Sequence, residues 1–106
     1  MSDQRDPVQM DADEAAAFAA EVFDRARQGD AEMLGRLLEN GLPVNLRNHK
    51  GDTLLMLASY HGHLQAVRVL LGHGADPAIA NDNGQLPLAG AAFKGNLDMV
   101  RLLVEQ

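Results

Sequence analysis

The chain has 106 residues, of which 46% are hydrophobic and 23% charged, and this length and composition are those of one small soluble domain. It contains no cysteine, which excludes disulfide bridges, thiolate chemistry and cysteine-based zinc sites. No apolar stretch is long enough to cross a membrane, and the acidic first residues hold no apolar signal segment, so we expect a cytoplasmic protein.

The formal net charge of −6 is concentrated near the N-terminus. Residues 1–24 hold seven acidic residues and one basic residue, whereas residues 25–106 hold eight of each and sum to zero. Nucleic acids and anionic lipid surfaces attract basic patches, so we expect neither as the main partner. We predict an acidic, flexible leader over residues 1–10 and a single domain over residues 11–106.

A long first helix is predicted to begin at Asp11. Asp11 and Glu14 have the spacing of a capping box, with Asp in place of the usual Ser or Thr. Apolar side chains follow at helical spacing and would form one face: Ala15, Ala19, Val22, Phe23 and Ala26. The opposite face is polar, as expected of a helix that covers the end of an array.

The rest of the chain repeats itself every 33 residues. Shifted by this period, Gly29 aligns with Gly62 and Gly95, and leucines at 37, 70 and 103 share a column. Residues 48–73 and 81–106 share nine identities in 26 positions, where unrelated segments would share about two. The constant offset identifies a repeat array.

Each unit predicts two short helices and a projecting loop. Thr53 to His61 is compatible with a helix whose apolar stripe is formed by Leu54, Leu55, Leu57 and Ala58. Gly62 would terminate this helix, because a glycine readily adopts the left-handed conformation. A second helix should open at His63, carry Leu64, Val67, Leu70 and Leu71 on one face, and end at Gly72 and Gly74. A turn-rich segment follows, and Pro87 suits the first turn of the next helix.

These residues resemble the ankyrin repeat. The resemblance is carried in the second unit by Gly51-x-Thr53-x-Leu55, Ala58, Gly62-His63-Leu64, Val67, Leu70-Leu71 and Gly74-Ala75-Asp76. It continues with Asn81-x-x-Gly84, Pro87-Leu88, Ala91-Ala92, Gly95-Asn96-Leu97 and Leu102-Leu103. It implies an all-α solenoid of about three repeats, at about 15–47, 48–80 and 81–106, the last one incomplete or uncapped.

The chain departs from the family pattern in the first helix of each unit. The usual Thr-Pro-Leu-His tetrapeptide reads Thr53-Leu54-Leu55-Met56 and then Leu86-Pro87-Leu88-Ala89. Both copies lack the histidine that ties neighbouring loops in the family, and the second also lacks the capping Thr. Gly90 lies inside a predicted helix, at a cost of ~1 kcal/mol relative to Ala.

The sequence offers no assembled reactive site. Of the four histidines, His61 and His63 flank Gly62 and cannot share a helical face, and we expect His63 to form structural hydrogen bonds. Asp52 and Asp82 could pair across neighbouring loops, but loop-tip Asp in this repeat usually shapes turns. We therefore expect no enzyme activity, no cofactor and no bound metal.

The resemblance places a partner-binding surface on the loop tips and the exposed side of the first helices. The positions that match the family's contact columns are Arg27, Arg47, His49, Lys50, Asp52, Tyr60, His61, Asp82, Asn83, Gln85, Phe93 and Lys94, with Gln28 beside Arg27. Tyr60 and Phe93 stand 33 residues apart and either anchor a partner or pack in part against neighbouring repeats.

The last predicted helix carries an apolar stripe of Leu97, Val100 and Val104. The stacking faces of a solenoid are apolar, so a final repeat without a cover is a liability. Either the natural protein continues, or another chain covers this face, and self-association through it is expected.

The leading functional prediction is a non-catalytic module that binds a protein partner. The alternative is an accessory or inhibitory subunit that regulates one particular enzyme. The two differ only in the consequence of binding. Seven Arg against two Lys and abundant Ala are typical of a high-GC bacterial source.

Overall fold

The computed structural model describes residues 11–105, and the predicted acidic leader at 1–10 lies outside this range. The described chain forms six helices: α1 (Ala12–Gln28), α2 (Ala31–Glu39), α3 (Leu54–Tyr60), α4 (Leu64–Gly72), α5 (Pro87–Phe93) and α6 (Leu97–Val104). Extended pairing over the same residues is limited to one isolated bridge between Arg47 and Thr53. The all-α prediction is confirmed.

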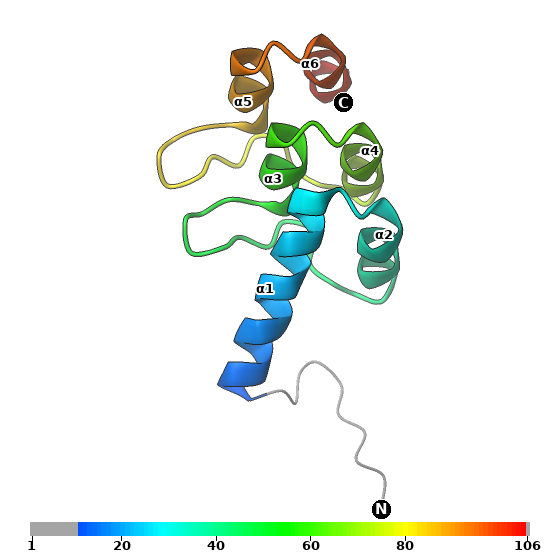
Figure 1. The fold of residues 1–106 in the computed structure, drawn as a ribbon, viewed down its shortest axis with the longest axis vertical. Helices are drawn as coiled ribbons and strands as arrows, with labels where there is room; N and C mark the ends of the chain where they lie inside the picture. Colours follow the sequence, from blue (N-terminus) through cyan, green and yellow to red (C-terminus); the bar gives the residue numbers. More distant parts are fainter. Residues whose placement is uncertain (1–10, 106) are drawn as a thin grey trace, which may run out of the picture.

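The helices stack in two columns (Figure 1). α3 lies between α1 and α5 in one column, and α4 lies between α2 and α6 in the other. The loops that lead into α3 and α5 project to the same side of the stack. This arrangement of repeated helix pairs is the predicted solenoid.

Local sequence signals set where most helices begin. At α1, the Glu14 amide donates to Asp11 Oδ1 (2.7 Å) and the Asp11 amide donates to Glu14 Oε1 (3.2 Å), which confirms the capping box. Thr53 caps α3 by accepting from the Met56 amide at 3.0 Å. Pro87 occupies the first turn of α5, whose N-cap Leu86 forms no side-chain cap bond.

Glycines end the first helix of each unit. Gly29, Gly62 and Gly95 have φ values of 74°, 80° and 71°, which residues other than glycine rarely adopt. At Gly29, an added Cβ would also collide with the His63 ring. The second helix ends where predicted: Gly72 is the last residue of α4, and Gly74 adopts the left-handed conformation at φ 89°.

The core runs along the contact between the two columns. All residues from Leu54 to Ser59 are buried, because α3 is covered by α1, α5 and α4. The predicted apolar stripe of α3 was therefore too narrow. The predicted α1 face is also corrected, because Ala15 is exposed and lies with Phe18 and Leu37 in an apolar hollow of about 290 Å³.

Backbone and side-chain hydrogen bonds tie the projecting loops together. The Asp82 amide donates to the Lys50 carbonyl (3.0 Å), and Arg47 Nη2 donates to the Ala80 carbonyl (3.1 Å). At the loop base, the Asp76 amide donates to Asn45 Oδ1 (2.9 Å). These bonds connect loops whose tetrapeptides lack the family's histidine.

Over residues 11–105, none of the helices combines the length and the apolar character needed to cross a membrane.

Candidate partner-binding groove

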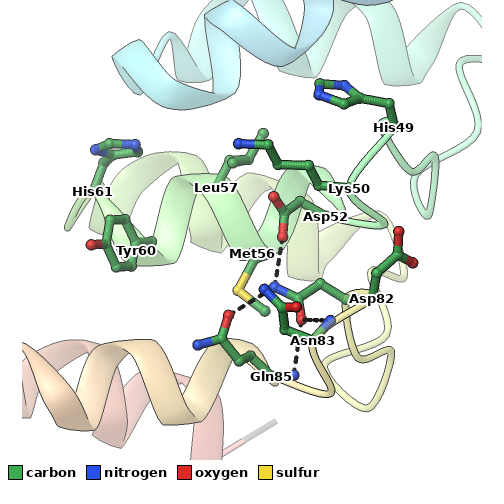
Figure 2. A pocket seen from close by; sticks show the side chains of 11 residues that line it. His49, Lys50, Asp52, Met56, Leu57, Tyr60, His61, Asp82, Asn83 and Gln85 are labelled. Carbon is green, nitrogen blue, oxygen red and sulfur yellow. Dashed lines mark hydrogen bonds between the residues drawn. The ribbon is translucent and has the colours of Figure 1, made fainter.

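A groove of about 630 Å³ opens between the two projecting loops and the side of α3 that carries Met56, Leu57 and Tyr60 (Figure 2). Eight of the twelve predicted contact residues line it: His49, Lys50, Asp52, Tyr60, His61, Asp82, Asn83 and Gln85. The two loops and the end of α3 therefore bring together side chains that are up to 36 residues apart in sequence, His49 and Gln85 being the extremes.

Asn81 organises the loop that forms one wall of the groove. Its Oδ1 accepts from the amides of Asn83 (3.0 Å) and Gln85 (2.9 Å). Its Nδ2 donates to Asp52 Oδ1 (2.9 Å) on the preceding loop and to Gln85 Oε1 (3.0 Å). One amide side chain thus fixes its own loop and joins it to the neighbouring loop.

Asn48 has the equivalent role in the preceding repeat. Its Oδ1 accepts from the amides of Lys50 and Asp52, both at 2.9 Å. Its buried Nδ2 has no hydrogen-bond partner among the described residues. The repeat accounts for one of the two bonds that Asn81 Nδ2 makes, because the position 33 residues before Asp52 is Ala19 of α1, which has no carboxylate to accept it.

The groove carboxylates are engaged by side chains of the same protein, whereas Lys50 in the groove and Lys94 nearby have no described carboxylate partner. Asp52 accepts from Asn81, and Asp82 lies 3.8 Å from Arg47 Nη2. Lys50 and Lys94 form no ion pair with any residue in the described range of the chain.

A second, smaller cavity of about 360 Å³ adjoins the groove. It is lined by Met56, Tyr60, Gln85, Ala89, Gly90 and Phe93. Tyr60 is 42% exposed and Phe93 is 87% exposed. The Tyr60 ring lies against Gly90 and so packs in part against the neighbouring repeat, whereas the Phe93 ring is largely exposed.

Positive groups gather where α1, α3 and α5 end. The Lys94 ammonium lies 4.3 Å from the centre of the Tyr60 ring, a cation–π distance. The ring of His61 meets Tyr60 edge-on at 5.3 Å. Partial burial lowers the pKa of His61 below 6.5, and the nearby positive charges of His63, Lys94 and Arg27 lower it further.

His63 is held in a structural role, as predicted. Its Nε2 lies 2.7 Å from the Arg27 carbonyl and joins α4 to the end of α1. Its ring stacks on His61, with 6.4 Å between the ring centres. Residues 11–105 contain no cluster of three or more His, Asp or Glu side chains arranged to hold a metal ion.

Four predicted contact residues lie outside the main groove. Phe93 lines the smaller cavity, and Lys94 lies over Tyr60 at its edge. Arg27 pairs with Asp24 at 2.8 Å. Arg47 holds the loops together through the Gly51 and Ala80 carbonyls.

Sequence reasoning missed three residues of the lining: Met56, Leu57 and Asn81. Met56 and Leu57 precede Tyr60 by four and three residues, so helical spacing could have placed them on the same face. The position of Asn81 at the start of the loop motif marked a turn, but its bond to Asp52 depends on how the two loops stack.

Comparison with known proteins agrees with this architecture. A family model described as ankyrin repeats, in three copies, matches residues 22–106. An ankyrin repeat protein of Pseudomonas aeruginosa is 62% identical over 56 residues, which are 53% of this chain and 33% of that protein. The human ankyrin repeat domain-containing protein 29 is 43% identical over 60 residues, 56% of this chain and 20% of that protein.

A third relative shows how such a segment can occur within a larger protein. An E3 ubiquitin-protein ligase of Arabidopsis thaliana is 50% identical over 46 residues, which are 43% of this chain and 9% of that protein. The aligned segments thus span a third or less of these relatives.

Proposed function

Because the chain belongs to the ankyrin-repeat family, we propose that it is a non-catalytic module that binds a protein partner in the groove between its loops and first helices. Repeats of this family generally act in protein–protein interaction. The observation that carries the proposal is the groove of about 630 Å³ on the predicted contact surface. We also propose that the protein acts in the cytoplasm, as expected from its sequence.

The form of the groove suits a protein ligand. It combines apolar surface from Met56 and Leu57 with charged and amide groups from both loops. Exposed rings at Tyr60 and Phe93 supply the kind of anchor that contributes most of the binding energy in protein interfaces. The loops that carry the polar groups are tied to each other, so little conformational freedom is lost on binding.

The test compares two double variants of the full chain. Tyr60→Ala with Phe93→Ala removes one ring from the groove and one from the adjoining cavity. Arg68→Ala with Arg101→Ala removes two exposed cations from α4 and α6 in the other helix column. Each protein is immobilised on a resin and incubated with a cell extract, and the captured proteins are quantified by mass spectrometry. We expect a partner that is retained by the wild type and the Arg variant and lost from the ring variant.

Circular dichroism and urea unfolding separate loss of binding from loss of fold. The ring variant should keep its helicity, because Phe93 is 87% exposed and Tyr60 is 42% exposed. Capture that is equal for all three proteins contradicts the groove. Loss of capture that only follows unfolding shows that the rings belong to the core and removes the proposed anchors.

The regulatory alternative predicted from the sequence is tested with the same proteins. Where the captured partner is an enzyme, its rate is measured with the wild type and with the ring variant. A change in rate with the wild type alone assigns a regulatory role, and an unchanged rate assigns an adaptor role.

A further inference from the structure

The smaller cavity and Lys94 form a composite site at the end of the groove. The cavity is walled by Tyr60 and Phe93 and has Met56 and Gly90 in its lining. The Lys94 ammonium lies over the ring of Tyr60, one of the residues that line this cavity. An apolar cavity and an ammonium group thus lie side by side on the proposed binding surface.

The charge of Lys94 has no carboxylate partner within the described chain. Among the Lys and Arg residues of 11–105, four form no ion pair with a described carboxylate: Lys50, Arg68, Lys94 and Arg101. Lys50 lines the groove, and Lys94 borders it. Arg68 and Arg101 belong to α4 and α6 and line neither cavity.

The carboxylates near this surface are already engaged. Asp24 pairs with Arg27 at 2.8 Å, Asp52 accepts from Asn81, and Asp82 lies 3.8 Å from Arg47. The groups that act electrostatically on His61, beside Tyr60, are all cationic or neutral: His63, Lys94 and Arg27. At the Tyr60 end, the charge of Lys94 is therefore not balanced by an ion pair with a described carboxylate, although the whole chain carries −6.

We propose that the smaller cavity receives an apolar side chain of the protein partner and that Lys94 pairs with a carboxylate next to that side chain. The inference rests on the proposed function and deepens it by naming the chemistry of the partner segment. Two exposed rings gain by burying an apolar side chain between them. A carboxylate satisfies an ammonium whose hydration the Tyr60 ring already limits.

The experiment selects ligands from a random peptide library displayed on phage, with the full chain as bait. Four baits are compared: the wild type, the ring variant Tyr60→Ala with Phe93→Ala, Lys94→Glu and the matched control Arg101→Glu. A single-stranded oligonucleotide is tested against the same four proteins. Both charge substitutions reverse an exposed cation without an ion pair to a described residue, but only Lys94 lies beside a ring that lines the cavity. We expect wild type and Arg101→Glu to enrich peptides in which Asp or Glu flanks a large apolar residue.

Charge reversal at Lys94 should change this preference. Lys94→Glu should abolish the enrichment of acidic residues and reduce the affinity for a selected acidic peptide about tenfold. Loss of the exposed ion pair accounts for about fivefold of this reduction, and repulsion by the new carboxylate for the remainder. Its control should bind that peptide with unchanged affinity. Raising the salt concentration should weaken binding to the wild type more than binding to Lys94→Glu.

The outcomes distinguish this inference from the proposed function. Peptides that require Tyr60 and Phe93 but show no acidic preference, or whose preference survives Lys94→Glu, overturn the inference and leave the groove intact. Failure to select any peptide that depends on the rings contradicts the groove and the inference together. If a single-stranded oligonucleotide binds and requires Lys94, while no selected peptide depends on Tyr60 and Phe93, the inference is overturned in favour of a phosphate ligand.

Discussion

His61 shows how the environment of one side chain sets a pH dependence. Burial and the charges of His63, Lys94 and Arg27 hold its folded-state pKa below 6.5. The unfolded chain therefore takes up a proton at a higher pH than the folded chain does. This contribution leaves stability unaffected well above pH 6.5 and lowers it as the pH falls through that value.

We predict that His61→Gln reduces the loss of stability between pH 7.5 and 5.5. The variant cannot take up the proton that favours the unfolded state. Urea denaturation at both pH values measures the change in the free energy of unfolding, with His49→Gln on the first loop as the control. An equal loss for the wild type and His61→Gln would show that His61 does not contribute.

Gly90 offers a second test at the level of a residue. It lies in the middle of α5, where glycine costs ~1 kcal/mol relative to Ala. A Cβ at this position would lie 3.4 Å from the Tyr60 ring, an ordinary contact distance. We therefore predict that Gly90→Ala raises the free energy of unfolding by up to about 1 kcal/mol in urea denaturation.

The matched control is Gly95→Ala. Gly95 has φ 71°, and a left-handed conformation costs other residues about 1–2 kcal/mol. Gly95→Ala should therefore destabilise the protein although an added Cβ meets no atom there. Destabilisation by Gly90→Ala would mean that the Tyr60 ring cannot accommodate the methyl group.

At the level of elements, the conformation of each projecting loop is held by the side chain of one asparagine rather than by regular secondary structure. The Asn81 side chain takes part in four hydrogen bonds within and between loops. Its removal leaves backbone amides and Asp52 without a partner. The sequence marked a turn here through Asn, Asp and Gly, but the bond between loops follows from the stacking of repeats.

We predict that Asn81→Ala lowers the free energy of unfolding by about 0.5–1.5 kcal/mol, the net value of a hydrogen bond, because water reaches the exposed loop groups that lose Asn81. Binding in the groove should weaken as well, because Gln85 and Asp52 lose their positions. Asn83→Ala is the control, since hydrogen bonds at Asn83 involve its backbone amide. Equal stability of the two variants, measured by thermal unfolding, would show that Asn81 does not organise the loop.

At the level of the whole molecule, the two ends of the stack differ. Leu88 is 39% exposed, whereas its counterpart Leu55 in the preceding repeat is 1% exposed because α5 covers α3. Leu97 and Val104 are 72% and 64% exposed. Repetition therefore places apolar side chains on an outer face that no described element covers.

We predict that the 106-residue chain self-associates through this face or loses amide protection in α6 before α4. Exposed apolar area favours association at high concentration and fraying of the last helix at low concentration. Analytical ultracentrifugation measures the first outcome and hydrogen exchange the second. Leu97→Ser should reduce association, and Arg101→Ser, on the same helix, should not.

A strict monomer at millimolar concentration, with α6 as well protected as α4, contradicts this prediction.

The sequence by itself determined the repeat, the order of the helices and most of their ends. These features are local: a capping box, a proline in a first turn and left-handed glycines act within a few residues, and the 33-residue period repeats them. Eight of the contact residues that the family resemblance predicted also line one groove, because equivalent positions of successive repeats lie on the same side of the stack.

Only the tertiary structure decided which of those side chains remain available to a partner. In the sequence, Arg47, Asp52, Lys50 and Lys94 were all predicted contact residues with charged side chains. In the structure, the side chains of Arg47 and Asp52 bond to the neighbouring loop, whereas the two lysines form no ion pair with described residues. The burial of α3 beyond its predicted stripe likewise depends on α1 and α5 on either side. Contacts between repeats join residues far apart in the chain, and a periodic pattern records which residues recur but not which of them meet.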